Sequence, residues 1–352
     1  MFLLKHFVLV VALLEFALAA ATRFPSRSSC SKEDMAVRKE WGEMPPAHRF
    51  GYTDAILCLM KKTPRLPTEH FPGVRNRVDD FVATHINYTL HVHYSGLFLP
   101  WHRHFMHLWE RALRDECGYW DWPLSSNLSE STLFDCSGSS LSGDGAYNPD
   151  EQGLSGGGYN VPRGSGGGCV TCGPFKDIKI HMGPFSRDLT SVTEIPAPGF
   201  DYHPRCLNRS LNNFVASNYN NATVVARLLA STDIVDFQTV MDHWPPRPDG
   251  VFGVHGGGHY SVGSTMQDLF SSAQDPVFFL HHAMVDRVWA MWQAKDEARR
   301  RYALNGTTVL MNPPWAEQVT LDTELEFGIL GRPRRVHEIM NPTTNGYCYR
   351  YT

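Results

Sequence analysis

The chain has 352 residues, of which 19% are charged and 42% are hydrophobic, and its formal net charge is −4. This composition is typical of a folded globular protein and excludes a disordered, collagen-like or coiled-coil chain. The slightly acidic balance also argues against a nucleic-acid-binding protein, which normally carries a basic surface. The unusual feature is the number of histidines, which is 17.

The first residues have the pattern of a secretory signal peptide. Lys5 and His6 precede an apolar stretch, and the small-residue pattern Ala17-Leu18-Ala19 ends it. The alternative is an N-terminal membrane anchor, which the short length of the apolar run disfavours. We expect a signal peptide of residues 1–21, a single mature domain of residues 22–352, and no later membrane span.

The eight cysteines are an even number, which fits an oxidising compartment. A disulfide between Cys30 and Cys58 is the pairing that we expect first, because it would join the first two predicted helices. Cys169 and Cys172 stand in a Gly-rich loop, where structural disulfides are favoured over a metal knuckle or a redox pair. Together with Cys136, they would pin the Gly- and Ser-rich stretch between them as a loop across one domain, rather than a linker between two.

Asn-x-Ser/Thr sequons also favour a secreted, extracellular protein. Asn87 begins a sequon but is expected to lie too close to the core to be glycosylated. N-glycans are expected at the other four asparagines that begin sequons, which are Asn127, Asn208, Asn221 and Asn305.

The first third of the chain predicts helices. The segments from Ser31 to about Met44 and from Thr53 to Lys62 each open on a capping residue. From Val74 onward, apolar residues recur at helical spacing, and His85 continues the same stripe.

Two further helices are predicted from strong local signals. The segment from Trp101 to Glu116 has apolar residues on one face, and His102 lies among them. Asp275-Pro276 has the pattern of an N-cap followed by proline at the first helical position, and the apolar face that follows includes His282. The predicted fold is therefore mainly α, with long loops.

Several histidines are spaced in a way that predicts a metal site. A buried imidazole needs a partner for each ring nitrogen, and a metal ion satisfies one of them. Residues 255 and 259 are four apart, which on a helix places both on one side. By this spacing the histidines form two groups of three. One is His85, His93 and His102, and the other is His255, His259 and His282. Imidazole suits Cu, Zn, Fe or Ni, so the ligand type alone does not select the metal.

The neighbours of these histidines have simpler interpretations. His104 and His107 fall on other faces of their helix and are expected to be exposed or to support the site. His281 is expected to point away from it. Gly256-Gly257-Gly258 is a poor helix interior, which costs up to ~1 kcal/mol per glycine relative to alanine, so we expect tight backbone packing there.

Two of these segments resemble copper-binding motifs. His93-Tyr-Ser-Gly-Leu-Phe-Leu-Pro-Trp-His102-Arg-His-Phe-Met-His-Leu-Trp-Glu110 resembles the first copper motif of tyrosinases, catechol oxidases and hemocyanins. Asp275-Pro-Val-Phe-Phe-Leu-His-His282-Ala-Met-Val-Asp286 resembles their second. The resemblance extends from about Cys30 to Tyr351 and is closest to short secreted fungal members.

The resemblance implies a four-helix bundle around a binuclear type-3 copper site. It assigns the first copper ion, CuA, to His85, His93 and His102, and the second, CuB, to His255, His259 and His282. It also implies that Glu110 and Asp286 support the site and that Trp101 and Phe278 form its dry walls. The substrate pocket would include Gly256, Tyr260 and Met266.

One departure from the family pattern bears on the activity. Many tyrosinases have an asparagine directly after the first CuB histidine, where it and a nearby glutamate hold a water thought to deprotonate monophenols. Gly256 stands at that position here, and Asp242 is only a weak substitute for the glutamate as a catalytic residue. The resemblance therefore implies a copper oxidase that uses O2 to convert o-diphenols to o-quinones, with monophenol oxidation left open.

Other functions remain alternatives at this point. The chain could tailor a phenolic specialised metabolite, bind O2 without catalysis as hemocyanins do, act as a zinc hydrolase, or have lost activity. The stretch Cys117–Trp122 looks about seven residues shorter than in relatives, and no C-terminal lid follows the final tyrosines, so no proteolytic latency is expected. The natural phenol and the oligomeric state are not indicated by the sequence.

Overall fold

The structure is a computed structural model that describes residues 30–113, 118–119, 127–156, 159–185, 194–195, 199–243 and 252–352. The predicted signal peptide lies outside these residues. Most of the stretch 117–122, which looks short in the sequence, also lies outside them.

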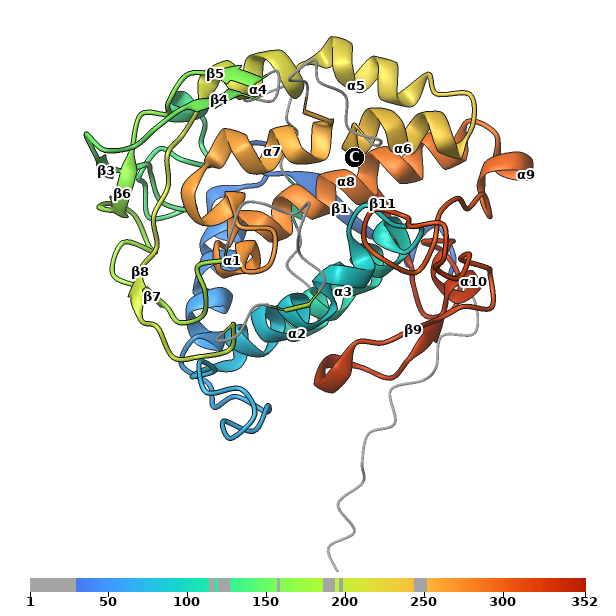
Figure 1. Cartoon of the computed structure of the whole chain (residues 1–352), viewed down its shortest axis with the longest axis horizontal. Helices are drawn as coiled ribbons and strands as arrows, with labels where there is room; N and C mark the ends of the chain where they lie inside the picture. The colour runs from blue at the N-terminus through green and yellow to red at the C-terminus, as the bar shows by residue number, and fades with distance from the viewer. Residues whose placement is uncertain are drawn as a thin grey trace, which may run out of the picture.

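Helices account for most of the regular structure (Figure 1). The helices are α1 (Pro46–Leu59), α2 (Arg77–Val92), α3 (Phe98–Leu113), α4 (Asn213–Tyr219), α5 (Ala222–Leu229), α6 (Ile234–Asp242), α7 (Val254–Val262), α8 (Val277–Ala294), α9 (Glu297–Arg300) and α10 (Val336–Ile339).

The strands are short and pair in small sheets. They are β1 (Ala36–Glu40), β2 (Gly118–Tyr119), β3 (Gly145–Tyr147), β4 (Leu154–Gly156), β5 (Tyr159–Val161), β6 (Gly167–Val170), β7 (Lys179–Ile180), β8 (Arg205–Cys206), β9 (Glu324–Leu325), β10 (Arg334–Arg335) and β11 (Tyr349–Tyr351). The largest sheet has the order β11-β1-β2 and is parallel, and the other four each have two antiparallel strands.

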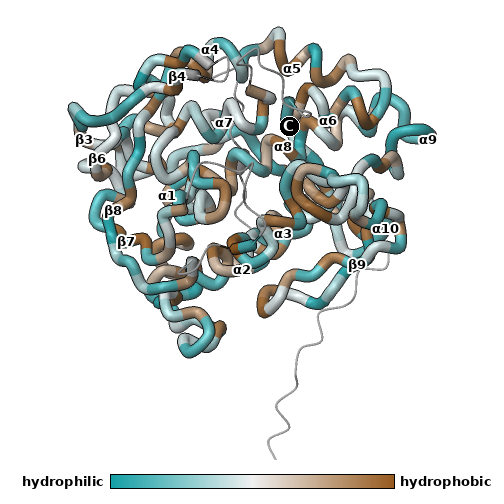
Figure 2. The backbone as a smooth tube through the Cα atoms, viewed as in Figure 1, coloured by the Kyte–Doolittle hydropathy of each residue, from teal (hydrophilic) through white to brown (hydrophobic). Residues whose placement is uncertain are grey.

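The core is a bundle of α2, α3, α7 and α8, as predicted. Helix α3 packs against α2 and α8, and α7 packs against α8. Stretches of α2, α3 and α8 are hydrophobic, whereas α9 at the rim is hydrophilic (Figure 2). Helix α2 begins where the Asn76 side chain accepts hydrogen bonds from the N–H groups of Val78 and Asp79, which satisfies donors that have no partner within the helix.

The helix predicted from Ser31 to Met44 is wrong. Residues there form strand β1, in which Ala36 pairs with Tyr349 and Lys39 pairs with Gly118. The partners come from segments far away in the sequence, so local capping and propensity rules could not reveal them. Helix α1 exists, but it begins at Pro46 rather than at Thr53.

The disulfide predicted between Cys30 and Cys58 is also wrong. Cys30 bonds to Cys348, which fastens the start of the described chain to strand β11, and Cys58 is a free, exposed thiol. The Gly- and Ser-rich stretch is pinned as predicted, through disulfides Cys136–Cys172 and Cys169–Cys206.

The sequon asparagines differ in exposure. Asn127 and Asn305 are exposed, while Asn208 and Asn221 are partly buried. Asn87 is exposed on α2, so the expectation that it lies near the core is wrong. Within the described ranges, no helix is long and apolar enough to cross a membrane.

Candidate metal centre

The four bundle helices bring the two predicted histidine groups together in the core. The first group is His85 on α2, His93 at its end and His102 on α3, and the second is His255 and His259 on α7 with His282 on α8. In each group the ring nitrogens lie within 4.8 Å of one another, and every member is buried. The rings of His102 and His282 stack with their centroids 4.4 Å apart, which joins the two groups.

Hydrogen bonds fix the orientation of five of these rings. In four of them, Nδ1 donates to a backbone carbonyl oxygen at 2.7 to 3.0 Å, because only a protonated nitrogen can bond to a carbonyl. In His255, Nδ1 lies 2.8 Å from Oδ1 of Asp242. In a neutral imidazole only one nitrogen carries a proton, so the four rings that donate to carbonyl oxygens leave an Nε2 lone pair that can bind a metal.

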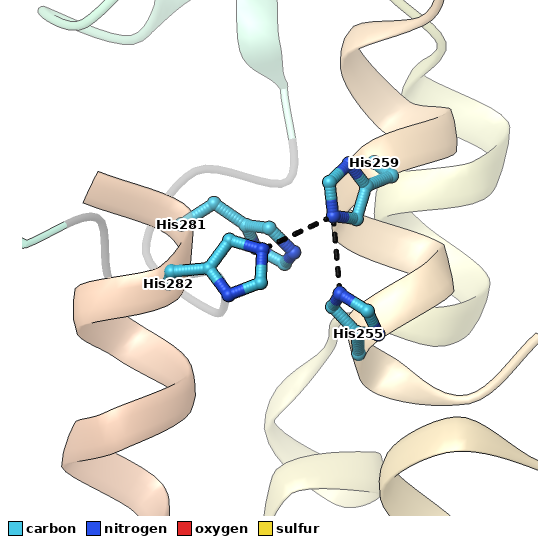
Figure 3. Close-up of side chains that lie close together, drawn as sticks. All are labelled: His255, His259, His281 and His282. Carbon is cyan, nitrogen blue, oxygen red and sulfur yellow. Dashed lines mark hydrogen bonds between the residues drawn. The ribbon is translucent and has the colours of Figure 1, made fainter. Parts of the chain in front are cut away.

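The distances between these lone pairs fit a metal ion. Nε2 of His259 lies 3.1 Å from Nε2 of His255 and 3.3 Å from Nε2 of His282 (Figure 3). Metal–imidazole bonds are about 2 Å long, so two nitrogens on one tetrahedral metal lie about 3.3 Å apart. Because Nδ1 of His255 and of His259 each has another partner, their Nε2 atoms face each other and can share one metal ion. In the first group, Nε2 of His85 and of His102 is buried with no hydrogen-bond partner among the described residues, as metal ligands require.

Burial keeps five of these imidazoles neutral. Loss of solvation lowers the pKa of His85 from 6.5 to about 4. It also lowers the pKa values of His93, His102, His259 and His282 well below their usual range, with repulsion between neighbouring histidines as a further cause. Neutral imidazole is the form that binds a transition metal.

His281 does not point away from the site, so that prediction is wrong. Its ring joins the second group within 4.8 Å (Figure 3) and stacks on the His255 ring, with an interplanar angle of 4°. Because His281 packs against the backbone of α7, a Cβ atom on Gly258 would lie 2.2 Å from its ring. A Cβ on Gly257 would lie 2.6 Å from Asn220. The tight packing expected of the glycine run thus holds at its second and third positions.

Gly256 is different from its two neighbours. Among the described residues, a Cβ atom there would meet only the side chain of Phe252, with the nearest atom at 3.7 Å. The predicted pocket residue Tyr260 stacks on the same ring, with centroids 4.5 Å apart. Met266, in contrast, is fully buried and contributes its carbonyl oxygen to Nδ1 of His259. Of the three predicted pocket residues, Gly256 and Tyr260 are therefore half-buried, whereas Met266 is fully buried.

Aromatic rings surround the histidines. Phe278 lies 4.2 Å from the ring of His282 and 5.0 Å from that of His85, measured between centroids. Trp101 packs against the rings of His85 and His102, and its indole N–H donates to the carbonyl oxygen of Glu326. Both aromatic side chains are fully buried, so they exclude water from this part of the centre.

Asp286 anchors the helices that carry the ligands. Its carboxylate accepts hydrogen bonds from Arg103 on α3 at 2.5 Å and from Arg38 on β1 at 2.9 Å. The hydroxyls of Tyr349 and Tyr351 on β11 donate to it at 2.6 Å each. Burial alone would raise the pKa of Asp286, but the two arginines lower it below the usual value. The carboxylate therefore stays charged and links α3, α8, β1 and β11.

Other contacts that support the site could not be predicted from the sequence. Glu110 forms an ion pair with Arg38, whose guanidinium also lies 3.6 Å over the ring of Tyr349. His104 is buried rather than exposed, and its Nδ1 lies 2.5 Å from the hydroxyl of Tyr347. The partners are more than two hundred residues apart along the chain in the pairs Arg38–Asp286 and His104–Tyr347, so no local signal could identify them.

Comparisons with known proteins agree with this geometry. The common central domain of tyrosinase matches residues 75–295. The chain is 50% identical to tyrosinase P of Aspergillus terreus, covering 92% of this chain and 93% of that protein. It is 45% identical to the N-acetyl-6-hydroxytryptophan oxidase of Emericella nidulans, covering 97% and 99%. A solved polyphenol oxidase from Thermothelomyces thermophila, in a glycine-to-asparagine mutant form, superposes with a TM-score of 0.84 at 36% identity, covering 93% of this chain and 91% of that one.

These relatives, the family match and the two three-histidine groups give one consistent answer. The histidine geometry fits a pair of copper ions, and the matching domain is the one that carries a binuclear copper site. The chain belongs to the tyrosinase family of type-3 copper proteins.

Proposed function

We propose that this chain is a secreted oxidase that uses O2 to oxidise an o-diphenol, or a related hydroxylated aromatic metabolite, to the quinone. The observation that carries the proposal is the convergence of unprotonated Nε2 atoms in a dry core beside the uncrowded Gly256. Two copper ions bound there would supply O2 binding and two-electron chemistry. The names of two relatives, a tyrosinase and an N-acetyl-6-hydroxytryptophan oxidase, support an aromatic hydroxyl substrate.

The residues of this chain would contribute geometry and exclusion of water. His85, His93 and His102 would hold CuA, and His255, His259 and His282 would hold CuB. The hydrogen bonds on Nδ1 fix five of the six rings, so little reorganisation is needed when a metal binds. The buried Phe278 and Trp101 would keep water away from the metals.

Asp242 has a different role from the one expected of a catalytic base. Its Oδ1 lies 2.8 Å from Nδ1 of His255, so we assign it to positioning that ring. A carboxylate hydrogen-bonded to a ligand histidine also makes the imidazole a stronger donor to the metal. With Asp242 engaged in this way and glycine at position 256, the chain lacks the asparagine–glutamate pair, which favours diphenols over monophenols.

Secretion is part of the proposal. The described residues contain three disulfides, which persist in oxidising compartments and are rare in the cytosol. Exposed sequon asparagines at positions 127 and 305 favour N-glycans there, and the partly buried Asn208 and Asn221 are proposed as further acceptors. Recovery of the protein from the culture medium tests secretion. Mass spectrometry of that protein before and after removal of N-glycans tests the glycosylation sites.

The decisive experiment compares O2 uptake by copper-loaded protein with a catechol, the matching monophenol and N-acetyl-6-hydroxytryptophan. A His282→Ala variant should lose the uptake, whereas His337→Ala, which removes an exposed histidine, should retain it. We expect uptake with the catechol and little with the monophenol. Full copper occupancy with no uptake on any substrate would overturn the proposed activity.

Gly256→Asn tests the specificity part of the proposal. The surroundings of Gly256 leave room for a side chain, so the variant should fold and bind copper. We expect a higher ratio of monophenol to diphenol oxidation, because the asparagine restores one half of the missing pair. Gly256→Ala is the matched control for the added bulk and should leave the ratio unchanged.

A further inference from the structure

One cavity of the protein lies away from the copper centre and is lined by cationic side chains. It has a volume of about 570 Å³ between the end of α1, the start of α2, the second half of α3 and the segment 330–334. Its walls contain six basic side chains, which are Lys62, Arg65, Arg77, Arg111, Arg332 and Arg334. Neither the six histidine ligands nor Gly256, Tyr260 and Phe278 line it. Along α3, Arg111 is about 13 Å from His102 at the usual rise per residue.

The positive charge in this cavity is only partly compensated. Asp80 pairs with Arg77 at 2.6 Å, and Glu338 pairs with Arg332 at 3.2 Å and with Arg334 at 3.1 Å. Over the described ranges, the structure gives no ion pair to the side chains of Lys62, Arg65 and Arg111. Counted over the described residues that line the cavity and their ion-pair partners, six cations and two carboxylates leave an excess of four positive charges.

The wall also contains guanidinium groups that carboxylates hold in place. Nη1 of Arg334 donates a hydrogen bond to Oε1 of Glu338 at 3.1 Å. A guanidinium fixed in this way needs little further ordering to bind an anion. The guanidinium of Arg77 is itself buried, and Asp80 holds it in place.

The shape of the cavity is built into the fold. Gly331 brings the segment 330–334 close to α3, since a Cβ atom there would lie 3.0 Å from Leu108. Arg332 and Arg334 thereby line the same cavity as Arg111. Strand pairing of β10 with β9 fixes the same segment from the other side.

We propose that this cavity binds a small organic polyanion, either a phosphate ester or a di- or tricarboxylate. Arginine forks match the oxygens of phosphate and carboxylate groups. The volume suits a small molecule, because ligand pockets typically measure about 300–1,000 Å³. A bound anion would tie together α1, α2, α3 and the segment 330–334, and so raise the thermal stability of the copper-loaded protein.

Isothermal titration calorimetry on the copper-loaded protein tests the proposal, at constant ionic strength. The probes are glycerol 2-phosphate, tricarballylate and inorganic sulfate. We expect one site per chain with a Kd below about 1 mM for one of the two organic anions, and the better of the two identifies the ligand class. Binding of sulfate alone, or of no probe, would reject the proposal.

A charge-matched pair of double variants locates the site. Lys62→Gln/Arg111→Gln should weaken binding about tenfold or more, because it removes two uncompensated cations from the cavity. Lys61→Gln/Arg227→Gln removes two exposed cations that do not line it and should leave the Kd unchanged. Equal weakening in both double variants would show a general charge effect and overturn the assignment.

Two further readouts separate this site from the copper chemistry. Copper content and O2 uptake should remain those of the parent protein in Lys62→Gln/Arg111→Gln, because neither residue touches the copper centre. If that double variant does not fold, Arg332→Gln replaces it, since the Arg332 side chain is 65% exposed and its loss leaves the core intact. Retained anion affinity in the folded variant would contradict the proposed site.

Discussion

Asp242 gives the second copper site a property that the first lacks. Four of the ligand histidines bond through Nδ1 to neutral carbonyl oxygens, whereas His255 bonds to a carboxylate. A charged acceptor strengthens the hydrogen bond and increases electron donation by the imidazole. The two metal positions should therefore differ in affinity, with CuB depending on a single side-chain charge.

Asp242→Asn should release copper from one of the two positions more readily. The amide oxygen can still accept from His255, but the charge is lost, and substitution of such supporting groups typically costs about 10–100-fold in metal affinity. Competition with a copper chelator measures the change for each ion. Asp177→Asn, an exposed substitution of the same kind, should leave both affinities unchanged; an equally small effect of Asp242→Asn would show that the carboxylate is dispensable.

Two glycines of the run on α7 look alike in the sequence but differ in their surroundings. At Gly258 an added Cβ would lie 2.2 Å from the buried ring of His281, whereas at Gly256 the nearest atom of any described residue is in Phe252, at 3.7 Å. Gly258→Ala should therefore displace α7 and lose copper, while Gly256→Ala should be neutral or stabilising by up to about 1 kcal/mol. Copper content and urea unfolding of the two variants measure this difference. Normal copper binding by Gly258→Ala would contradict the packing argument.

At the scale of the elements, three of the four helices that carry the proposed copper ligands could be predicted and the strands could not. Helices α2, α3 and α8 have apolar residues at helical spacing, and α8 also has a start signal at Asp275-Pro276, which are local properties of the sequence. Helix α7 contains the run Gly256–Gly258, which is a poor helix interior. Strand β1 is defined by pairing with β11, whose residues lie more than three hundred positions away. Likewise, Cys30 finds Cys348 at a separation of 318 residues rather than the nearby Cys58.

The candidate site shows the same division. The six proposed ligands could be named from the sequence because three of them lie in the two long motifs and the other three follow from histidine spacing and the family resemblance. The supporting residues could be named in part, as with Asp286, but their partners Arg38, Tyr349 and Tyr351 come from β1 and β11. His281 was misplaced because a helical projection gives a direction and not the depth at which a neighbouring helix packs.

The contacts of Asp286 make β1 and β11 part of the metal-binding scaffold. Asp286→Asn leaves the buried Arg38 and Arg103 without their shared counter-charge, and breaking such a network costs about 3–5 kcal/mol. Urea unfolding should show a decrease of this size in the free energy of unfolding. Asp322→Asn removes a carboxylate whose side chain is 77% exposed and should change it by less than about 1 kcal/mol. A similarly small effect for Asp286→Asn would mean that the anchor is not energetically important.

At the scale of the whole molecule, the buried histidines make the copper-free fold sensitive to acid. The pKa of His85 falls from 6.5 in a solvated chain to about 4 in the folded protein, so between these values the unfolded chain binds more protons than the folded one. The stability that this lowered pKa contributes is therefore fully present above about pH 6.5 and is lost as the pH falls toward 4. A shift of this size corresponds to about 3 kcal/mol for His85 alone, and His93, His102, His259 and His282 act in the same direction.

Copper should widen the difference in folding stability between neutral and acidic pH. Only unprotonated imidazole binds the metal, and a ligand that binds the folded state alone adds to its stability. Urea unfolding at about pH 7.5 and about pH 5, with and without copper, should show both effects. The copper-free protein should lose stability at the lower pH, and the stabilisation by copper should shrink there. His85→Leu should flatten the pH dependence of the copper-free protein, whereas His337→Leu should not. A copper-free protein that is equally stable at both pH values would contradict the burial of neutral histidines on which the proposed copper chemistry depends.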